Sequence, residues 1–185
     1  MVFEERRYTL GEHEVVLRSA AADDVDMLLP YLKTVCGETR FLMSEADEVN
    51  LSREEELQFI EDYNSSDNGM LIIAFFDGKY AGNCSFRGRS GSRRYKHRAG
   101  IGIALYQKFT GMGLGRLMLN VLLEEIRSHG FEQVELIVIG GNDRAKHLYE
   151  SLGFREYGRL PDANRYDDGT SADDILMVLR FDEDK

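Results

Sequence analysis

The spacing of apolar residues along the chain predicts alternating strands and helices. A short apolar run between polar turns is typical of a strand, and apolar residues recurring every three or four positions are typical of a helix. We expect helices at 22–35, after Ser52, at 113–128 and at 142–152. We expect strands at 14–19, 70–76, 79–86, 99–106, 134–139, 154–159 and 175–181. This order predicts a mixed α/β sheet with helices packed on its faces.

Individual residues mark where several of these elements begin, end or bend. Ser52 followed by Glu55 matches a capping box, which predicts a helix start at that point. Pro30 lies inside the first expected helix and predicts a kink or a break there. Gly130 and Gly153 fit the C-terminal ends of the two later helices.

The connections between the expected elements are polar or irregular. Asp77-Gly78 separates two apolar runs and predicts a tight hairpin. Residues 36–50 are less regular and are expected to form a loop with some helix. Residues 87–98 are polar and basic, and they predict an exposed loop or strand end. The strands at 99–106 and 134–139, by contrast, are expected to be buried.

Length and composition favour one packed domain over residues 1–185. The chain has 185 residues, of which 43% are hydrophobic. No apolar run approaches the roughly 20 residues that a membrane-spanning helix needs, so a membrane is not an expected partner. Residues 1–7 are charged and lack an apolar signal core, which favours a cytoplasmic location. Cys36 and Cys84 match no metal-ligand spacing and are expected to be reduced thiols.

The charge balance of the chain bears on its partners. The chain carries 33 acidic and 23 basic residues, a formal net charge of −10. Nonspecific nucleic-acid binding needs a basic surface, so nucleic acid is not an expected partner. The negative field favours a cationic substrate through long-range steering. A solvated acidic surface without a binding role is the alternative explanation for most of these carboxylates.

A glycine-rich turn joins the strand at 99–106 to the helix at 113–128. From Thr110 to Arg116 it reads Thr-Gly-Met-Gly-Leu-Gly-Arg. Glycines allow positive φ and a close approach of the backbone to a ligand. Successive N–H groups at the positive end of a helix can then converge on an anion, and a phosphate suits such a site. A plain tight turn between strand and helix is the alternative.

Two other phosphate-binding motifs do not match this turn. A Walker loop requires Gly-Lys-Ser/Thr, whereas Gly115 is followed by Arg116 and Leu117. The dinucleotide-binding fingerprint requires a glycine at the position of Arg116. The turn therefore predicts an anion site of a different kind from those of nucleotide hydrolases and dinucleotide-binding domains.

A second group of residues follows the strand at 134–139. Asn142 can cap the next helix. Tyr149 lies seven residues later, about two turns along the same face. Its hydroxyl could donate a proton to a leaving thiolate. A buried core tyrosine beside a capping asparagine is the alternative interpretation.

Together, the two regions resemble the GNAT acyltransferase superfamily over roughly residues 70–154. The family's glycine motif is Gln or Arg, two residues, Gly, one residue, and then Gly or Ala. Here it falls on Thr110, Gly113 and Gly115. Thr110 departs from the motif and removes one side-chain contact, while the backbone amides remain. The family's second region is matched by Asn142, Ala145, Leu148, Tyr149, Gly153 and Phe154.

The resemblance implies a splayed central mixed β-sheet flanked by helices, with acetyl-CoA as the acetyl donor. The pantetheine arm would lie between the strand ending near Leu105 and the strand ending near Ile139. Backbone groups of the first strand would pair with this arm, and amides of the glycine turn would hold the pyrophosphate. The cofactor-binding residues implied by the resemblance are Ile103, Leu105, Thr110, Gly111, Met112, Gly113, Leu114, Gly115, Arg116, Asn142, Ala145 and Tyr149.

The resemblance also implies direct attack of an amine on the thioester of acetyl-CoA in a ternary complex. Tyr149 would lie near the sulfur and act as the general acid. The identity of the base stays open, because the strand at 99–105 holds no carboxylate. By position, Glu38 is the leading catalytic candidate and Glu45 is another, both on the segment expected to cover the acceptor. His97 precedes the strand by too great a length to be preferred, and water relays could also serve.

The acceptor stays open at this point. Residues 158–177 look like the final hairpin of relatives that act on small amines, amino acids or protein N-termini, although an ordinary acidic turn explains them as well. We expect a small-molecule primary amine, such as an amino acid or a polyamine. A protein N-terminus or lysine is the alternative acceptor, and a non-catalytic CoA-binding sensor is the alternative class. The oligomeric state is open, with a homodimer as one alternative.

Overall fold

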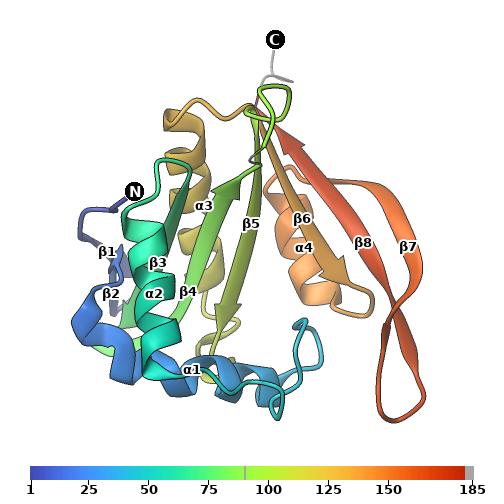
Figure 1. Cartoon of the computed structure of the whole chain (residues 1–185), viewed down its shortest axis with the longest axis horizontal. Helices are drawn as coiled ribbons and strands as arrows, with labels where there is room; N and C mark the ends of the chain where they lie inside the picture. Colours follow the sequence, from blue (N-terminus) through green and yellow to red (C-terminus); the bar gives the residue numbers. More distant parts are fainter. Residues whose placement is uncertain (90, 182–185) are drawn as a thin grey trace. The chain divides into compact units, whose positions relative to one another are not determined.

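The computed structural model describes residues 1–89 and 91–181. These residues form eight strands and four α-helices (Figure 1). The helices are α1 (Val25–Glu38), α2 (Arg53–Asn64), α3 (Leu114–Ser128) and α4 (Asp143–Ser151), with short 3-10 turns η1 (Ala22–Asp24) and η2 (Gln107–Phe109). The strands are β1 (Arg6–Leu10), β2 (His13–Ser19), β3 (Gly69–Phe76), β4 (Lys79–Gly88), β5 (Arg98–Leu105), β6 (Gln133–Ile139), β7 (Arg155–Arg165) and β8 (Ser171–Arg180).

The described residues divide into two compact units. The first unit contains Met1–Arg87 and Gly102–Glu124. The second contains Gly88–Ile101 and the part of the chain that begins at Glu125. Strand β5 and helix α3 contribute residues to both units, because the chain crosses from one unit to the other within each of them. A single domain over residues 1–185 stays a prediction.

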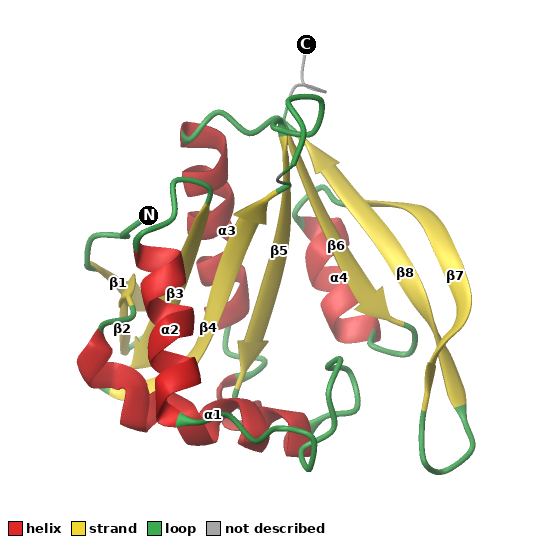
Figure 2. Cartoon of the chain, in the orientation of Figure 1, coloured by secondary structure: helices red, strands yellow, loops and turns green. Residues whose placement is uncertain are grey.

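The first unit is an antiparallel sheet with helices on its faces. Strands β1 to β4 pair as antiparallel neighbours in chain order, and Figure 2 shows α1 and α2 in front of them. Leu71 and Ile73 of β3 lie in an apolar core with buried residues of α1 and α2. Ile72 faces the other way by strand alternation. On the face of Ile72, the Cys84 Sγ lies 3.9 Å from the Met118 carbonyl oxygen of α3. Both faces of β3 are therefore buried, which explains its continuous apolar sequence.

A bulge in β4 brings this strand unusually close to the end of β5. The pairing of β3 with β4 shifts register between Ala74 and Phe75, which leaves an extra residue in β4 before Gly82. Gly82 has φ of 148°. A Cβ at this position would overlap the Ala104 carbonyl oxygen and lie 2.8 Å from the Leu105 Cα. Only glycine therefore fits the bulge without displacing the end of β5.

The second unit is built around β6. This strand runs parallel to β5 through three residue pairs, from Arg98–Gln133 to Gly100–Glu135. It runs antiparallel to β8 over its whole length, and β8 in turn pairs with β7. The β7–β8 hairpin extends well past β6 (Figure 2). The strand order in this unit is therefore β5-β6-β8-β7.

Several sequence predictions are confirmed. Strands and helices follow the expected order and form a mixed α/β sheet flanked by helices. The Ser52 Oγ accepts the Glu55 amide at 3.2 Å, and the Glu55 carboxylate accepts the Ser52 amide at 2.8 Å, as a capping box requires. Asp77 and Gly78 have φ of 48° and 73°, so the predicted hairpin closes through two left-handed residues.

Two predictions about the first unit differ from the structure. Strand β1 was not expected, because its largely exposed residues carry no strong alternating pattern. Helix α1 is continuous through Pro30, so of the predicted kink or break the break does not occur, and the kink stays a prediction. Proline removes one helical hydrogen bond. Leu28 and Tyr31, on either side of Pro30, are both buried, so core packing outweighs that loss.

The burial expected for the two middle strands is only partly observed. In β5, Ala99 is buried, Gly102 is exposed and the other residues are half-buried. The reason is that the ladder from β5 to β6 ends at Gly100, so the rest of β5 has no such neighbour. Strand β6 is mostly buried, although Ile137 is 59% exposed. Separately, no helix within the described residues has the length and apolar content needed to cross a membrane.

Candidate functional site

The glycine turn lies between η2 and α3 in the first unit. Gly111 and Gly113 have φ of 79° and 86°, a left-handed conformation that residues with a Cβ rarely adopt. The Thr110 hydroxyl donates a hydrogen bond to the Gln107 carbonyl oxygen at 2.6 Å. The departure from Gln or Arg at Thr110 thus has a local role, because the hydroxyl closes the turn that leads into the glycines.

The amides of this turn are free of backbone partners. Among the described residues, the amides of Gly111, Met112 and Gly113 donate to no backbone acceptor. The Leu117 amide donates to the Gly113 carbonyl oxygen at 3.1 Å. Leu114 and Gly115 lie in the first turn of α3, where backbone amides have no acceptor within the helix. Converging N–H groups at the positive end of a helix bind anions. This turn can therefore hold a phosphate or a pyrophosphate.

The end of β5 directs some of its backbone groups away from β4. The Tyr106 amide donates to the Ala81 carbonyl oxygen of β4 at 3.0 Å. Backbone groups alternate sides along a strand, so those of Ile103 and Leu105 point away from β4. The side chains of both residues are half-buried. The first unit thus offers these backbone groups for pairing with an extended ligand arm.

Glu38 is held beside the start of the glycine turn. It ends α1, and its Oε2 accepts the Gln107 backbone N–H at 2.7 Å. Gln107 lies only two residues after the end of β5. Desolvation, and then the negative charge of Glu38, raise the pKa of Tyr106. The structure therefore brings a carboxylate to the end of β5, although β5 itself carries none.

Three tyrosines near the end of β5 were not identified from the sequence. The Tyr31 ring centroid lies 5.0 Å from that of Tyr80 and 5.1 Å from that of Tyr106. The Tyr31 hydroxyl donates to the Ala104 carbonyl oxygen at 2.5 Å. Burial raises the pKa of both Tyr31 and Tyr80 far above the ordinary value, so their hydroxyls stay neutral. The cluster fixes β5 against α1, and its members come from separate elements that no sequence spacing connects.

Asn142 and Tyr149 belong to α4 and its cap in the second unit. The Asn142 Oδ1 accepts the Ala145 amide at 3.3 Å, which confirms the predicted cap. The Tyr149 side chain is 8% exposed, and its ring centroid lies 5.7 Å from that of Phe154. Tyr149 therefore contributes to the packing of α4, as the core interpretation expects. Its role as an acid stays a prediction.

Other candidate residues occupy varied positions. Leu114 is fully buried, and Gly115 and Arg116 follow it in the first turn of α3. Glu45 is exposed between α1 and α2. In the second unit, the His97 carbonyl oxygen accepts the amides of Glu132 and of Gln133, the first residue of β6. In the described part of the chain, no group of three or more His, Cys, Asp or Glu residues could hold a metal ion.

Comparison with known proteins identifies relatives of the chain. The model of the Acetyltransferase (GNAT) family matches residues 38–154, more than half of the chain. The chain is similar to mycothiol acetyltransferase of Beutenbergia cavernae, with 48% identity over 44 residues. It is also similar to ribosomal protein bS18-alanine N-acetyltransferase of Salmonella typhimurium, with 43% identity over 54 residues. These segments cover 24% and 29% of this chain, and only 15% and 36% of the two relatives.

Two solved structures share the architecture. An acetyltransferase of the GNAT family from Streptococcus pneumoniae aligns with a TM-score of 0.84 and 29% identity, covering 90% of this chain and 99% of that one. A putative acetyltransferase from Salmonella typhimurium, solved with its cofactor acetyl-CoA, aligns with a TM-score of 0.80 and 20% identity, covering 91% and 95%. These similarities confirm the fold that the sequence resemblance implied.

Proposed function

The chain belongs to the Acetyltransferase (GNAT) family, and on this premise we propose that it transfers an acetyl group from acetyl-CoA to a primary amine. The observation that carries the proposal is the glycine turn, where three successive amides donate to no backbone acceptor among the described residues. The pyrophosphate of CoA has the negative charge that such amides bind. The two curated relatives are matched over at most 36% of their length, so the activity is proposed from the site and not taken over from them.

The residues that would bind the cofactor fit this role within each unit. In the first unit, amides from Gly111 to Arg116 would bind the pyrophosphate, and Thr110 would shape the turn. Backbone groups of Ile103 and Leu105, which point away from β4, would pair with the pantetheine arm. In the second unit, the proposed cofactor contacts are Asn142, Ala145 and Tyr149.

The chemical step needs a neutral amine, because the nitrogen lone pair attacks the thioester carbonyl carbon. A lysine-like amine has a pKa of about 10.4 and must first lose a proton. We assign the removal of that proton to Glu38, acting as the general base. Its Oε2 accepts the Gln107 amide, while its Oε1 makes no hydrogen bond to a described residue. The C–N bond forms while backbone N–H groups stabilise the carbonyl oxygen. The C–S bond then breaks, and the Tyr149 hydroxyl gives the sulfur its proton. The nitrogen loses its remaining extra proton as the amide forms, and this proton restores the Tyr149 hydroxyl through water.

For the acceptor, we propose a small primary amine such as an amino acid or a polyamine. The overall charge of −10 supports a cationic acceptor through long-range attraction. A protein N-terminus is the second candidate, favoured by the 43% identity with the ribosomal protein bS18-alanine N-acetyltransferase over 54 residues. We also propose a cytoplasmic location, which the free, buried thiols of Cys36 and Cys84 support.

A thiol-release assay with purified full-length protein and acetyl-CoA tests the activity. A panel of amino acids, polyamines and peptides with free N-termini supplies the acceptors, and mass spectrometry after incubation with cell extract detects protein acceptors. Acetylation of a small amine supports the first candidate, and acetylation of proteins alone supports the second. Tight CoA binding without thiol release or protein acetylation with any acceptor would overturn the enzyme proposal. It would leave the non-catalytic CoA-binding sensor as the explanation.

A further inference from the structure

Acidic and basic residues are unevenly distributed along the chain. The protein has 33 acidic residues, yet none lies between Asp77 and Glu124. Within that stretch, the turn formed by Arg93, Arg94, Tyr95 and Lys96, which we call the basic turn, carries three cations in four residues. It precedes β5 in the second unit. A net charge of −10 therefore coexists with a local positive surface.

A buried carboxylate anchors both ends of the basic turn. The Glu135 side chain on β6 is 5% exposed. Its Oε2 lies 3.3 Å from Arg89, which precedes the turn, and 2.9 Å from Arg98, which follows it. The Gln133 side chain donates to the Glu135 Oε1 at 2.8 Å. The Arg98 guanidinium also lies 5.3 Å from the ring centroid of Tyr95. Arg89 and Arg98, on either side of the basic turn, are thus paired with the same carboxylate.

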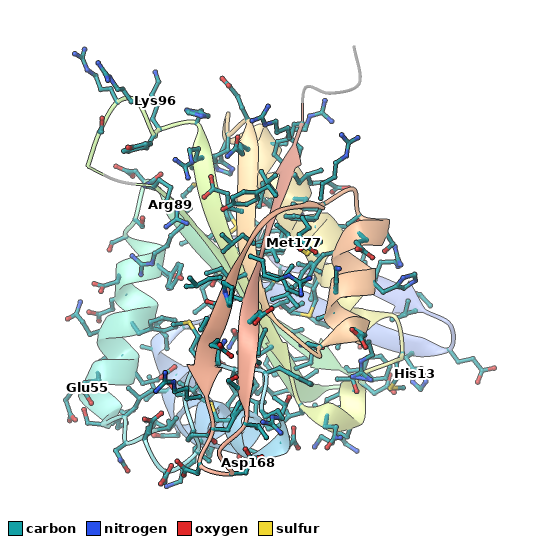
Figure 3. All side chains as sticks on the ribbon, turned by 90° about the vertical axis from the view of Figure 1, so that its right-hand side faces the viewer. His13, Glu55, Arg89, Lys96, Asp168 and Met177 are labelled. Atoms are coloured by element: carbon teal, nitrogen blue, oxygen red, sulfur yellow. The ribbon has the colours of Figure 1, made fainter. Side chains whose placement is uncertain are left out.

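The cations of the basic turn itself are left uncompensated. Arg93, Arg94 and Lys96 are exposed, and none of them forms an ion pair with a described carboxylate. Figure 3 shows Lys96 on a loop that extends beyond the strands, with Arg89 closer to them. Arg89 and Arg98, on either side of the turn, instead form ion pairs with Glu135. The cations on either side of the turn are thus neutralised, whereas Arg93, Arg94 and Lys96 within it are exposed to solvent.

We propose that the basic turn is a docking site for a short acidic segment of a partner protein. Guanidinium groups bind carboxylates through paired N–H bonds, and Lys96 adds a mobile point charge. The four residues form a turn, which keeps the three cations close together, so they suit a short run of neighbouring carboxylates. Tyr95, 49% exposed between the cations, adds a contact surface of the kind that is enriched at protein interfaces.

The charge of the remaining protein selects this kind of partner. A nucleic acid carries negative charge well beyond the turn, where it meets a chain of net charge −10. An anionic membrane meets the same repulsion, and the basic turn has no aliphatic side chain to insert. In a contact between two copies of the chain, the basic turn of one copy would bind an acidic surface of the other. Such a head-to-tail contact leaves one basic turn unoccupied unless the copies close into a ring. A short acidic segment avoids this repulsion because its charge ends within reach of the turn.

Fluorescence anisotropy of a labelled octaglutamate peptide, titrated with the full-length protein, tests the proposal. We expect binding at low salt that weakens toward about 0.15 M, because salt screens exposed charges. Arg94→Gln/Lys96→Gln should weaken the peptide affinity by about tenfold. The matched control, Lys33→Gln/Lys79→Gln, removes the same charge from exposed lysines of the first unit and should change the affinity by less than about twofold.

Several results would overturn the proposal. No peptide binding at low salt would remove the site, and an equal loss in both double variants would show a general effect of net charge. Tighter binding of a labelled octauridylate would assign the turn to nucleic acid. Binding to phosphatidylserine vesicles that is lost in Arg94→Gln/Lys96→Gln would assign it to membranes. Self-association lost in the same variant would assign it to a second copy. Thermal unfolding should be unchanged in both double variants, because the anchor around Glu135 is intact in each.

Discussion

At the residue scale, the hydroxyl of Tyr149 distinguishes a chemical role from a packing role. Tyr149→Phe removes the hydroxyl and keeps the ring that packs 5.7 Å from Phe154. If the hydroxyl protonates the leaving sulfur, turnover falls by about 10²–10⁴-fold, the range of positioned proton transfer. CoA affinity and the thermal midpoint should stay near the wild-type values. Steady-state kinetics, calorimetric titration and thermal unfolding measure the three quantities.

The packing role makes the opposite prediction for the same variant. A lower thermal midpoint with intact turnover on the true acceptor would remove Tyr149 as the acid. Phe154→Leu serves as the matched control, because it disturbs the same ring contact without touching a hydroxyl. We expect it to lower the thermal midpoint and to leave the chemical step nearly unchanged.

Glu38→Gln tests the carboxylate beside the glycine turn. A glutamine oxygen can still accept the Gln107 amide, so the local hydrogen bond is kept while the charge and the basicity are lost. We expect turnover to fall by about 10²-fold or more, with CoA affinity unchanged, and the pH–rate profile to lose one ionisation. The pKa of Tyr106 should also move down toward its ordinary value, because the charge of Glu38 raises it. An unchanged rate and profile would make Glu38 an ordinary surface acid.

Single residues were predictable from the sequence where their role is local. The caps Ser52 and Asn142 act within three residues, so their hydrogen bonds follow from spacing alone. The contact of Glu38 with Gln107 joins residues 69 positions apart, and only the fold reveals it. The pairing of Arg98 with Glu135 likewise depends on the register of β5 against β6, which no periodicity specifies.

At the element scale, the glycine turn depends on backbone conformation. Gly113 has φ of 86°, a left-handed conformation that a β-branched residue such as valine rarely adopts. Gly113→Val should therefore distort the turn and lower CoA affinity by at least about tenfold in calorimetric titration. Gly130→Val is the matched control, because Gly130 has φ of 82° and ends α3 away from the turn sequence. Equal CoA affinity in a folded Gly113→Val protein would refute the assignment of the pyrophosphate to this turn.

The close approach of β4 and β5 makes a second prediction at this scale. Gly82→Ala would force its Cβ against Ala104 and Leu105, so we expect a loss of about 1–3 kcal/mol in the free energy of unfolding. Gly102→Ala, in β5 itself, has open space around its Cβ and should be nearly neutral. Denaturant unfolding of the two variants measures the difference. Similar stability in both would show that the bulge relaxes without cost.

Elements were predictable where apolar spacing and boundary residues agree. The β3–β4 hairpin and helix α3 carry both signals, and both form as expected. Strand β1 was missed because a strand at the edge of a sheet needs little apolar surface. Pro30 predicts a kink or a break, and the break does not occur, since the sequence shows the lost hydrogen bond but not the tertiary packing that offsets it. The incomplete burial of β5 follows from a ladder that ends early, which composition cannot show.

At the scale of the whole molecule, the proposed cofactor should stabilise the folded protein. A ligand that binds only the native state at about 100 times its Kd adds about 2.7 kcal/mol to the free energy of unfolding. CoA should therefore raise the thermal midpoint of the wild-type protein. It should raise that of Gly113→Val by at most about half as much, because a tenfold weaker affinity leaves about 1.4 kcal/mol of stabilisation. Differential scanning fluorimetry over a range of CoA concentrations measures both. A wild-type midpoint that does not respond to CoA would contradict the proposed cofactor.

The family and the fold could be predicted from two short regions, the glycine turn and the α4 segment. The acceptor could not be predicted from them. The glycine turn and the α4 segment lie within residues 38–154, which the family model matches. We propose that both serve the cofactor, whose constant chemistry would keep their residues similar within the family. Acceptor recognition would depend on tertiary contacts such as that of Glu38, which vary with the amine. The sequence shows that residues 87–98 are basic, but only the fold shows that Glu135 pairs with Arg89 and Arg98 on either side of the basic turn.

The unbonded amides of Gly111, Met112 and Gly113 give the free protein an unusual solvent-exchange signature. Backbone amides in helices and strands exchange their hydrogens slowly, since each must first break a hydrogen bond. These three amides have no such bond to break among the described residues, so they should exchange quickly until an anion occupies the turn. Deuterium uptake in this peptide therefore reports occupancy directly, in a cell extract as well as with pure ligand. It does so whether or not any acetyl group is transferred.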